Sequence, residues 1–135
     1  MNIGGFPSDT ILSEYTYVAA KMLLSGWKIA YCAEAEVYHS HNYSFFQEFK
    51  RYFDIGVFQS RESWIQEKFG KAEGEGFRYV ISEWKYLWNH HHKSSIPLAF
   101  LRTVAKYLGY RFGLVEDMLP ISLKRMISMH HRYWK

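Results

Sequence analysis

Histidines are the residues of this chain whose spacing suits metal chemistry. His39 and His41 are two positions apart, so in a β-strand both side chains would point to the same face of the sheet. Imidazole is a common metal ligand. The alternative is a pair of polar residues at the end of a strand. Two histidines alone do not decide between these interpretations.

The remaining candidates for chemistry are weaker. The runs at 90–92 and 130–131 are consecutive histidines, and neighbours on a helix point in different directions, so neither run can chelate one ion while helical. The sequence has no Asp-X-Asp motif, and its glycines at 74 and 76 flank an acid that would repel phosphate. Cys32 is the single cysteine and has no evident base partner. This excludes an internal disulfide and gives no support to a nucleophilic enzyme.

Length and composition indicate one modest folded domain. The chain has 135 residues, of which 48% are hydrophobic and 19% aromatic, and this is too apolar for a disordered protein. It shows no secretory signal and no run of about 20 apolar residues that could span a bilayer. From these features we expect a cytoplasmic protein, either soluble or peripheral at the inner membrane face.

Positive charge gathers in the C-terminal part of the chain. The net charge is +4, and from Ile96 onward seven lysines and arginines stand against two acids. A basic tail rich in aromatic residues suits an anionic membrane surface. The alternative is the solvated surface of ordinary helices. We expect no nucleic acid partner, because no nucleic-acid-binding motif accompanies the charge.

The candidate residues would be positioned by a loop, a helix and two short strands. Ser13 is predicted to cap the first helix and Gly26 to end it. Alternation of apolar and polar residues predicts strands over 27–32 and 35–41, joined by Ala33 and Glu34. Because two strands are too few for an independent sheet, we expect them to form the edge of a larger one.

Beyond residue 43 the pattern is helical. Ser44 and Gln47 have the spacing of a capping box, and an apolar stripe runs from Phe45 to Val57. A polar break at 70–76 precedes a second helix, and a further helix starts with Pro97 in its first turn. Pro120 breaks the chain again before the last basic segment. The apolar face of the helix after Pro97 is predicted to contain Leu98, Leu101, Ala105 and Leu108.

Three features of residues 3–41 occur in the order found in one enzyme family. A Gly-Gly-Phe loop comes first, an acidic helix start follows at Glu14, and a glycine-ended helix then leads through the strand pair to Val37-Tyr38-His39. The segment resembles the closing part of the GT-A catalytic domain in family 2 glycosyltransferases, in particular the bacterial rhamnosyltransferases of polysaccharide assembly. The resemblance covers roughly residues 3 to 65 well.

The resemblance implies an α/β fragment that is mostly helical. Residues 1–42 would be the C-terminal remnant of a GT-A catalytic domain, carrying the two short strands at its edge. Residues 43–135 would be a helical C-terminal region. The half of the domain that grips the nucleotide-sugar is not represented, so the chain by itself is expected to be inactive.

The resemblance also assigns roles to residues near the start of the chain. Gly4, Gly5, Phe6 and Asp9 would lie on the acceptor side, although Asp9 also suits a helix or turn cap. In the family the helix starts with Glu-Asp, and the aspartate deprotonates the acceptor hydroxyl. Here Glu14 is followed by Tyr15. A phenol with a pKa of about 10 is almost wholly protonated at neutral pH, so the usual base is missing.

His39 matches the histidine that completes a divalent metal site in many GT-A enzymes, with His41 beside it. The intact family uses manganese or magnesium there. Because the Asp-X-Asp half of that site is absent, we expect this chain alone to bind no metal.

The leading hypothesis is therefore part of an inverting glycosyltransferase. The intact enzyme would transfer a sugar such as rhamnose from a nucleotide donor to a polysaccharide or lipid-linked acceptor, with its basic tail on an anionic membrane. The alternative is a non-enzymatic helical module that binds a membrane surface or a protein partner.

Overall fold

The computed structural model describes residues 3–39, 41–70 and 73–135. Ser40 falls in the predicted second strand, and Lys71 and Ala72 fall in the predicted glycine-rich break. These three residues lie outside the described parts of the chain.

The described residues form six α-helices and three short 3-10 turns. The helices are α1 (Glu14–Leu24), α2 (Phe45–Arg61), α3 (Ser63–Phe69), α4 (Glu73–Asn89), α5 (Ile96–Leu114) and α6 (Ile121–Ile127). The turns cover Lys93–Ser95, Glu116–Met118 and His131–Tyr133.

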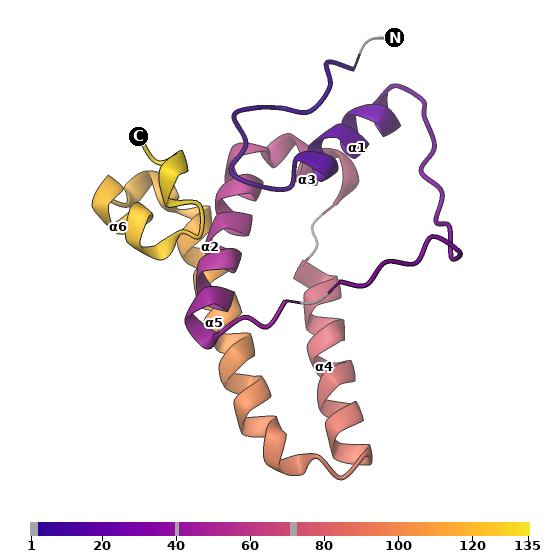
Figure 1. Cartoon of the computed structure of the whole chain (residues 1–135), viewed down its shortest axis with the longest axis vertical. Coiled ribbons are helices and arrows are strands. Elements are labelled where there is room, and N and C mark those ends of the chain that lie inside the picture. Colours follow the sequence, from indigo (N-terminus) through magenta and orange to yellow (C-terminus); the bar gives the residue numbers. More distant parts are fainter. Residues whose placement is uncertain (1–2, 40, 71–72) are drawn as a thin grey trace.

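Helices α2 and α5 lie side by side at the centre of the molecule (Figure 1). Helix α4 comes after α3 in the sequence and turns through Lys93–Ser95 into α5, so that α4 and α5 make a long hairpin. Helix α6 and the last turn lie on the other side of α2, while α1 lies near α3. The buried hydrophobic cluster joins α2, the loop before α1 and the C-terminal segment.

The predicted α/β class with two short strands is wrong, because the fold is all-helical and no strand occurs among the described residues. The turn predicted at Ala33 and Glu34 is present, and the Ala35 N–H donates to the Cys32 carbonyl over 3.3 Å. The flanking segments do not pair. Tyr31 is 93% exposed and Val37 84% exposed. An isolated two-stranded hairpin is marginally stable at best unless one of its faces is buried. Among the described residues, none covers a face of this segment.

Of the two predicted ends of α1, only the C-terminal one is confirmed. Gly26 ends the helix in a left-handed conformation, with φ of 86°, and its N–H donates to the Leu23 carbonyl over 3.1 Å. Ser13 precedes Glu14 as expected, but it has φ of 61° and its side chain makes no capping hydrogen bond. A capping serine needs extended backbone to reach back to the first turn, so the predicted cap at Ser13 is wrong.

The capping box at the start of α2 is confirmed. The Ser44 N–H donates to Gln47 Oε1 over 2.9 Å, and the Gln47 N–H donates to Ser44 Oγ over 3.4 Å. Two N–H groups that the helix itself cannot satisfy are thus paired. This local signal fixes where α2 begins.

We expect Ser44→Ala to lower the free energy of unfolding by about 1 kcal/mol, because the Gln47 N–H loses its acceptor. Urea denaturation followed by circular dichroism measures this. Ser13→Ala is the matched control and should change little, since the Ser13 side chain makes no capping bond. Equal losses in the two variants would contradict the assignment of the cap.

The later helix boundaries are close to those predicted. Helix α4 already begins at Glu73, inside the expected break. Helix α5 has Pro97 in its first turn, and α6 begins directly after Pro120, both as predicted. The fixed φ and missing N–H of proline account for these two helix starts, because proline is compatible with a first turn but not with a helix interior.

The predicted apolar face of α5 is confirmed at Ala105, which is buried, and wrong at its three leucines. Leu98, Leu101 and Leu108 are exposed. The residues of α5 buried against α2 are small and spaced four apart, namely Ala105, Gly109 and Gly113. Gly109 lies against the backbone of Phe49 in α2, and a Cβ added at Gly113 would lie 2.8 Å from Gly56 Cα. Small side chains let the two backbones touch, and this decides which face of α5 is inside.

Candidate functional site

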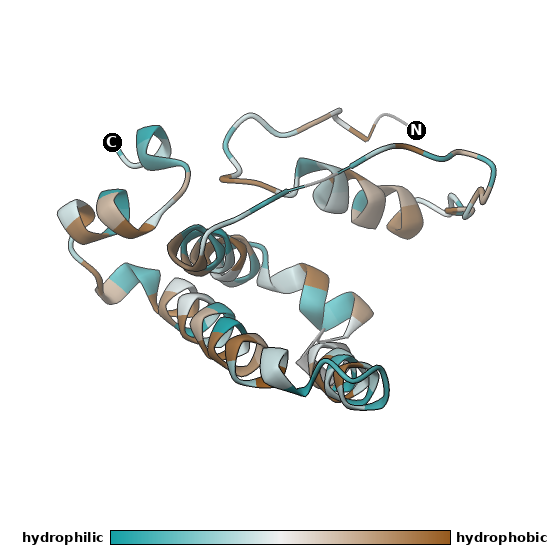
Figure 2. Cartoon of the chain, turned by 60° about the horizontal axis from the view of Figure 1, so that its bottom comes forward, coloured by the Kyte–Doolittle hydropathy of each residue, from teal (hydrophilic) through white to brown (hydrophobic). Residues whose placement is uncertain are grey.

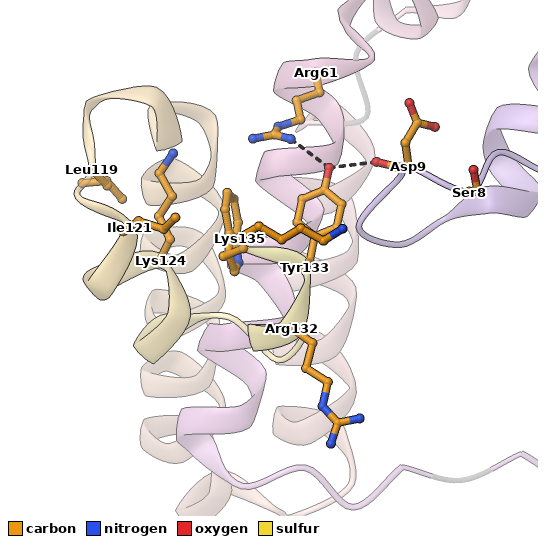
Figure 3. Close-up of a pocket in the computed structure, with 10 residues that line it drawn as sticks. Ser8, Asp9, Arg61, Leu119, Ile121, Lys124, Arg132, Tyr133 and Lys135 are labelled. Carbon is orange, nitrogen blue, oxygen red and sulfur yellow. Dashed lines mark hydrogen bonds between the residues drawn. The ribbon is translucent and has the colours of Figure 1, made fainter.

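A cavity of about 800 Å³ lies between the end of α2, the loop before α1, α6 and the last residues of the chain (Figure 3). Its volume is within the range of small-molecule sites. Four of its lining residues are cationic and one is acidic. The lining residues are Ser8, Asp9, Arg61, Leu119, Ile121, Lys124, Arg132, Tyr133, Trp134 and Lys135.

One buried carboxylate organises the basic wall. Glu116 has only 1% of its side chain exposed, and its Oε1 accepts from Arg61 Nε over 2.7 Å. Its Oε2 accepts from Lys124 Nζ. Arg61 comes from the last turn of α2 and Lys124 from α6. Glu116 therefore draws together two cations that are 63 positions apart in the sequence.

Tyr133 connects this wall to the loop before α1. Its hydroxyl accepts from Arg61 Nη1 over 2.8 Å and donates to the Asp9 carbonyl over 2.9 Å, as Figure 3 shows. Trp134 lies buried beneath, with the Arg61 guanidinium 5.3 Å and the Lys124 ammonium 5.0 Å from its ring centre. Aromatic faces attract cations, so the two positive groups are held in place by rings as well as by the acid.

Contacts within the cluster shift the pKa values of Glu116 and Arg61. Burial alone would raise the pKa of Glu116, but hydrogen bonds and charges from Lys124 and Arg61 outweigh it, and the pKa lies below the usual value. Burial of Arg61 acts to lower its pKa, but Glu116 and Tyr133 reverse this and raise the pKa. Glu116 and Arg61 are therefore ionised at neutral pH.

A second buried acid fixes the C-terminal segment to α2. Asp54 is fully buried, and its Oδ2 accepts from the Met129 N–H over 2.9 Å. Burial raises the pKa of Asp54, although hydrogen bonds from Ser128 and Met129 and the charge of His130 oppose that rise. Asp54 thus anchors to α2 the segment that carries Tyr133 and Trp134.

We expect Asp54→Ala to lower the free energy of unfolding by about 1–3 kcal/mol, because the part-buried Met129 N–H loses its acceptor. Asp54→Asn keeps an acceptor oxygen and removes a buried charge, so its loss should be clearly smaller. Chemical denaturation at pH 7 of the three proteins measures both differences. An Asn variant as unstable as the Ala variant would mean that the carboxylate charge itself is needed.

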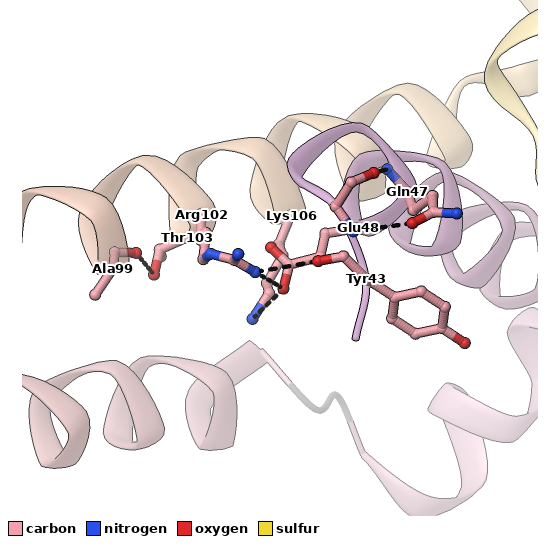
Figure 4. A network of polar contacts seen from close by, with 8 residues as sticks. Tyr43, Gln47, Glu48, Ala99, Arg102, Thr103 and Lys106 are labelled. Atoms are coloured by element: carbon pink, nitrogen blue, oxygen red, sulfur yellow. Dashed lines mark hydrogen bonds and ion pairs between the residues drawn. The ribbon is translucent and has the colours of Figure 1, made fainter. Parts of the chain in front are cut away.

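A third polar cluster connects α5 to the start of α2 (Figure 4). Arg102 Nη1 donates to Glu48 Oε1 over 2.8 Å and to the Tyr43 carbonyl over 3.4 Å, and Lys106 Nζ lies 3.9 Å from the same Glu48 oxygen. Arg102, Lys106 and Lys124 all belong to the predicted basic tail. Their positive charges are paired within the fold and do not all form one outward basic face.

The acceptor-side residues predicted from the sequence are only partly brought to this cavity. Asp9 lines it, and its backbone carbonyl accepts from Tyr133. Gly4 and Gly5 have φ of 84° and 70°, which suits glycine, and Phe6 is exposed. None of these three lines the cavity. The contact of Asp9 with the C-terminal segment was not visible in the sequence.

The predicted catalytic and metal residues lie elsewhere. Glu14 and Tyr15 occupy the first turn of α1, where Tyr15 is exposed. His39 and His41 touch each other edge to face, with ring centres 4.2 Å apart, and His41 stacks on Tyr43. None of the four lines the basic cavity. Among the described residues, no interaction joins Glu14 or Tyr15 to the two histidines.

The histidine pair offers two imidazole ligands to a divalent ion. In the described part of the chain, no three histidine, cysteine or acidic side chains are close enough to hold a metal. Two imidazoles leave most positions around manganese or magnesium open, and magnesium prefers oxygen ligands. The residues described here do not form the expected metal site by themselves.

Sequence reasoning did not identify Arg61, Glu116, Lys124 or Tyr133 as site residues. A weak signal existed in Glu116, since it is one of only two acids among seven cations after residue 96. An acid inside a basic stretch often has a structural partner. Its actual partners could not be assigned without the tertiary structure.

The comparisons point to sugar transferases as the class to which the chain is related. It is 53% identical to the O-antigen chain rhamnosyltransferase WbaN of Salmonella anatum over 132 residues, which are 98% of this chain. It is 52% identical to the O-antigen chain rhamnosyltransferase RfbN of Salmonella typhimurium over the same length. The chain spans 42% of the length of each of these relatives. No family model and no solved structure matches it.

Among the described residues, none of the helices has both the length and the apolar composition needed to cross a membrane.

Proposed function

We propose that this chain is part of a rhamnosyltransferase that acts in polysaccharide assembly, in the GT-A class of family 2. The observation that carries the proposal is the identity of 52–53% across 98% of the chain. In the intact enzyme, rhamnose would pass from a nucleotide donor to a polysaccharide or lipid-linked acceptor. By itself the chain would be inactive, because the relatives contain further sequence that it does not span.

The segment just before the division proposed at residue 42 is exposed, although Ile11 from the first part belongs to the same buried cluster as α2. The described residues between 21 and 43 include no buried side chain, whereas α2, α5 and the C-terminal segment hold most of the core. We propose that the exposed apolar side chains near residues 27–38 are covered in the intact enzyme by the rest of the catalytic domain. His39 and His41 would then receive further metal ligands from that part, and Gly4, Gly5 and Phe6 would border the acceptor.

A chimera tests the proposed activity. Residues of this chain replace the matching 132-residue region of one relative, and transfer of labelled rhamnose is measured in cells that lack that relative. Restored transfer is expected, because about half of the exchanged residues are identical. A chimera that is stably expressed and transfers no rhamnose would contradict the proposal.

Within the same chimera, Tyr15→Asp supplies the carboxylate that the resemblance to family 2 transferases implies for this position. We expect faster transfer, because a carboxylate is ionised at neutral pH and can accept the hydroxyl proton. Tyr15→Asn has a similar size and no charge, and serves as the control. If Asp and Asn have equal rates, Tyr15 does not occupy the base position.

The second candidate function is membrane binding, and the exposed hairpin of α4 and α5 favours it. Figure 2 shows hydrophobic segments recurring along both helices. Exposed aromatic residues lie on both, and Lys93 at the connection stacks on Trp88 at 4.2 Å. Aromatic rings beside cations suit the interface of an anionic bilayer. We propose that this hairpin holds the transferase at the cytoplasmic membrane face. The buried Trp134 of the tail would not take part.

Sedimentation with vesicles of phosphatidylglycerol and phosphatidylcholine tests the hairpin. Trp88 is 60% exposed and Trp27, which lies off the hairpin, is 57% exposed. Trp88→Ser should lower the bound fraction several-fold, whereas Trp27→Ser should leave it unchanged. Equal effects of the two substitutions would rule out the hairpin as the membrane contact.

A further inference from the structure

We propose that Tyr133 is a positioning residue, which holds the loop before α1 in the place that acceptor binding requires. This role rests on the proposed function, in which Gly4, Gly5 and Phe6 border the acceptor at the start of that loop. The contacts that carry it join the C-terminal segment to residues 8–13, and the two parts that meet are 124 positions apart in the sequence.

One hydrogen bond connects the loop to the C-terminal segment. The Tyr133 hydroxyl donates to the Asp9 carbonyl over 2.9 Å (Figure 3). In the described part of the chain, no other hydrogen bond from outside the loop and α1 reaches residues 8–13. The Thr10 hydroxyl is buried without a hydrogen-bond partner, and the Ser13 side chain makes no capping bond. Tyr133 therefore supplies the polar contact that determines where the loop lies.

The Tyr133 side chain is itself fixed by its neighbours. Arg61 Nη1 donates to its hydroxyl over 2.8 Å, and the Arg61 guanidinium lies 5.4 Å from its ring centre. Arg61 is in turn bound by Glu116, whose side chain is only 1% exposed. Trp134 packs edge to face against Tyr133, with ring centres 5.3 Å apart. Successive hydrogen bonds polarise one another, so the bond from Arg61 makes the Tyr133 hydroxyl a stronger donor to the loop.

The loop ends in a residue with an unfavourable backbone conformation. Ser13 has φ of 61° and ψ of 32°, a left-handed conformation that costs free energy for a residue other than glycine. Such a conformation persists where contacts on both sides fix the chain. Before Ser13, the chain is fixed by the Asp9 hydrogen bond and by Ile11, which is 4% exposed. After it, Tyr17 of α1 meets Trp64 edge to face, with ring centres 5.7 Å apart.

The proposed acceptor side adjoins this loop at both ends. Phe6 is three residues before Asp9, a span of about 11 Å at most, and Glu14 and Tyr15 begin α1 directly after the loop. Without the Asp9 hydrogen bond, the loop would occupy its binding arrangement for a smaller fraction of the time. The apparent affinity for an acceptor falls by that fraction. The transfer step itself is unaffected, because a bound acceptor restores the arrangement.

The kinetics of the chimera described above test this role, with acceptor and donor concentrations varied separately. Tyr133→Phe removes the hydroxyl and keeps the ring that packs against Arg61 and Trp134. We expect the KM for the acceptor to rise about fivefold, while kcat and the KM for the nucleotide donor change by less than about twofold. Tyr52→Phe is the matched control, because the Tyr52 hydroxyl makes no hydrogen bond within the described residues. It should change none of the three constants.

NMR relaxation of the chain reports on the loop without any transfer activity. In Tyr133→Phe we expect the order parameters of the Asp9 and Thr10 amides to fall from about 0.85, typical of rigid backbone, toward about 0.6. The amides of α2 should keep their values, and so should all of these amides in Tyr52→Phe.

The outcomes distinguish the positioning role from the proposed function. An active chimera in which Tyr133→Phe leaves the acceptor KM unchanged, or affects it no more than Tyr52→Phe does, would overturn the positioning role alone. Unchanged order parameters at Asp9 and Thr10 would overturn it as well. A chimera that transfers no rhamnose before any substitution refutes the proposed function and the acceptor role with it, and the order parameters then decide only whether Tyr133 holds the loop.

Discussion

Gly113→Ala is expected to lower the free energy of unfolding by at least about 3 kcal/mol, the upper end of the range for overpacked cores. The new Cβ would collide with the Phe53 carbonyl oxygen and would lie 2.8 Å from both Gly56 Cα and Val57 N. These atoms belong to the backbone of α2 and cannot rotate aside as a side chain does. The helices must separate, and the packing along their whole contact is lost. Denaturant unfolding measures the change.

Gly76→Ala is the matched control within α4. A Cβ at Gly76 meets nothing within 4 Å, and alanine is favoured over glycine in a helix by about 0.5–1 kcal/mol. Stability should therefore rise slightly. Gly109→Ala should act like Gly113→Ala, because its Cβ would meet the Phe49 carbonyl. A Gly113→Ala protein as stable as the unmodified chain would show that α2 and α5 do not pack this closely.

Glu116→Ala is expected to lower the free energy of unfolding by about 3 kcal/mol, because it leaves two cations without their shared carboxylate. This is the lower end for a broken buried pair, since the Arg61 side chain is 42% exposed and water can partly replace the acid. Asp117→Ala changes the neighbouring, exposed acid in the same turn. It should stay within about 0.5 kcal/mol of the unmodified chain.

The contribution of Glu116 should depend on pH. Its pKa is lower in the folded chain than in the unfolded chain, so the unfolded state binds more protons at mildly acidic pH. The stabilisation is present above the unfolded value of about 4.3 and is lost as the pH falls through the folded pKa. Asp54 acts in the opposite direction, because its pKa is raised. The difference between the chain and Glu116→Gln, measured from pH 7 down to about 3, isolates the Glu116 contribution. A difference that does not vary with pH would contradict the pairing.

Several boundaries of the fold were predictable from the sequence because they depend on neighbouring residues. The Ser44 and Gln47 capping box, the Gly26 stop and the proline starts at Pro97 and Pro120 act within about one turn of helix. Such signals are complete in a few consecutive residues. Ser13 is the exception, because the backbone conformation that its cap requires is not encoded in the residue type.

The candidate site was predictable to a smaller extent. The resemblance to family 2 transferases identified the class of the curated relatives, and the composition placed positive charge in the C-terminal part. Neither indicated that Glu116 would join Arg61 to Lys124, or that Tyr133 would reach Asp9 across 124 positions. Pairings at such separations follow from how the helices pack, and no local pattern specifies them.

The sequence by itself determined where most helices begin and end, because caps, glycines and prolines act on the backbone beside them. Only the tertiary structure decided which faces are buried. Alternating residues at 27–39 form no strand where no neighbouring strand receives them, and α5 turns its glycines rather than its leucines toward α2. The physical reason is that burial is a property of two surfaces. A periodic pattern describes one of them, and the partner supplies the other.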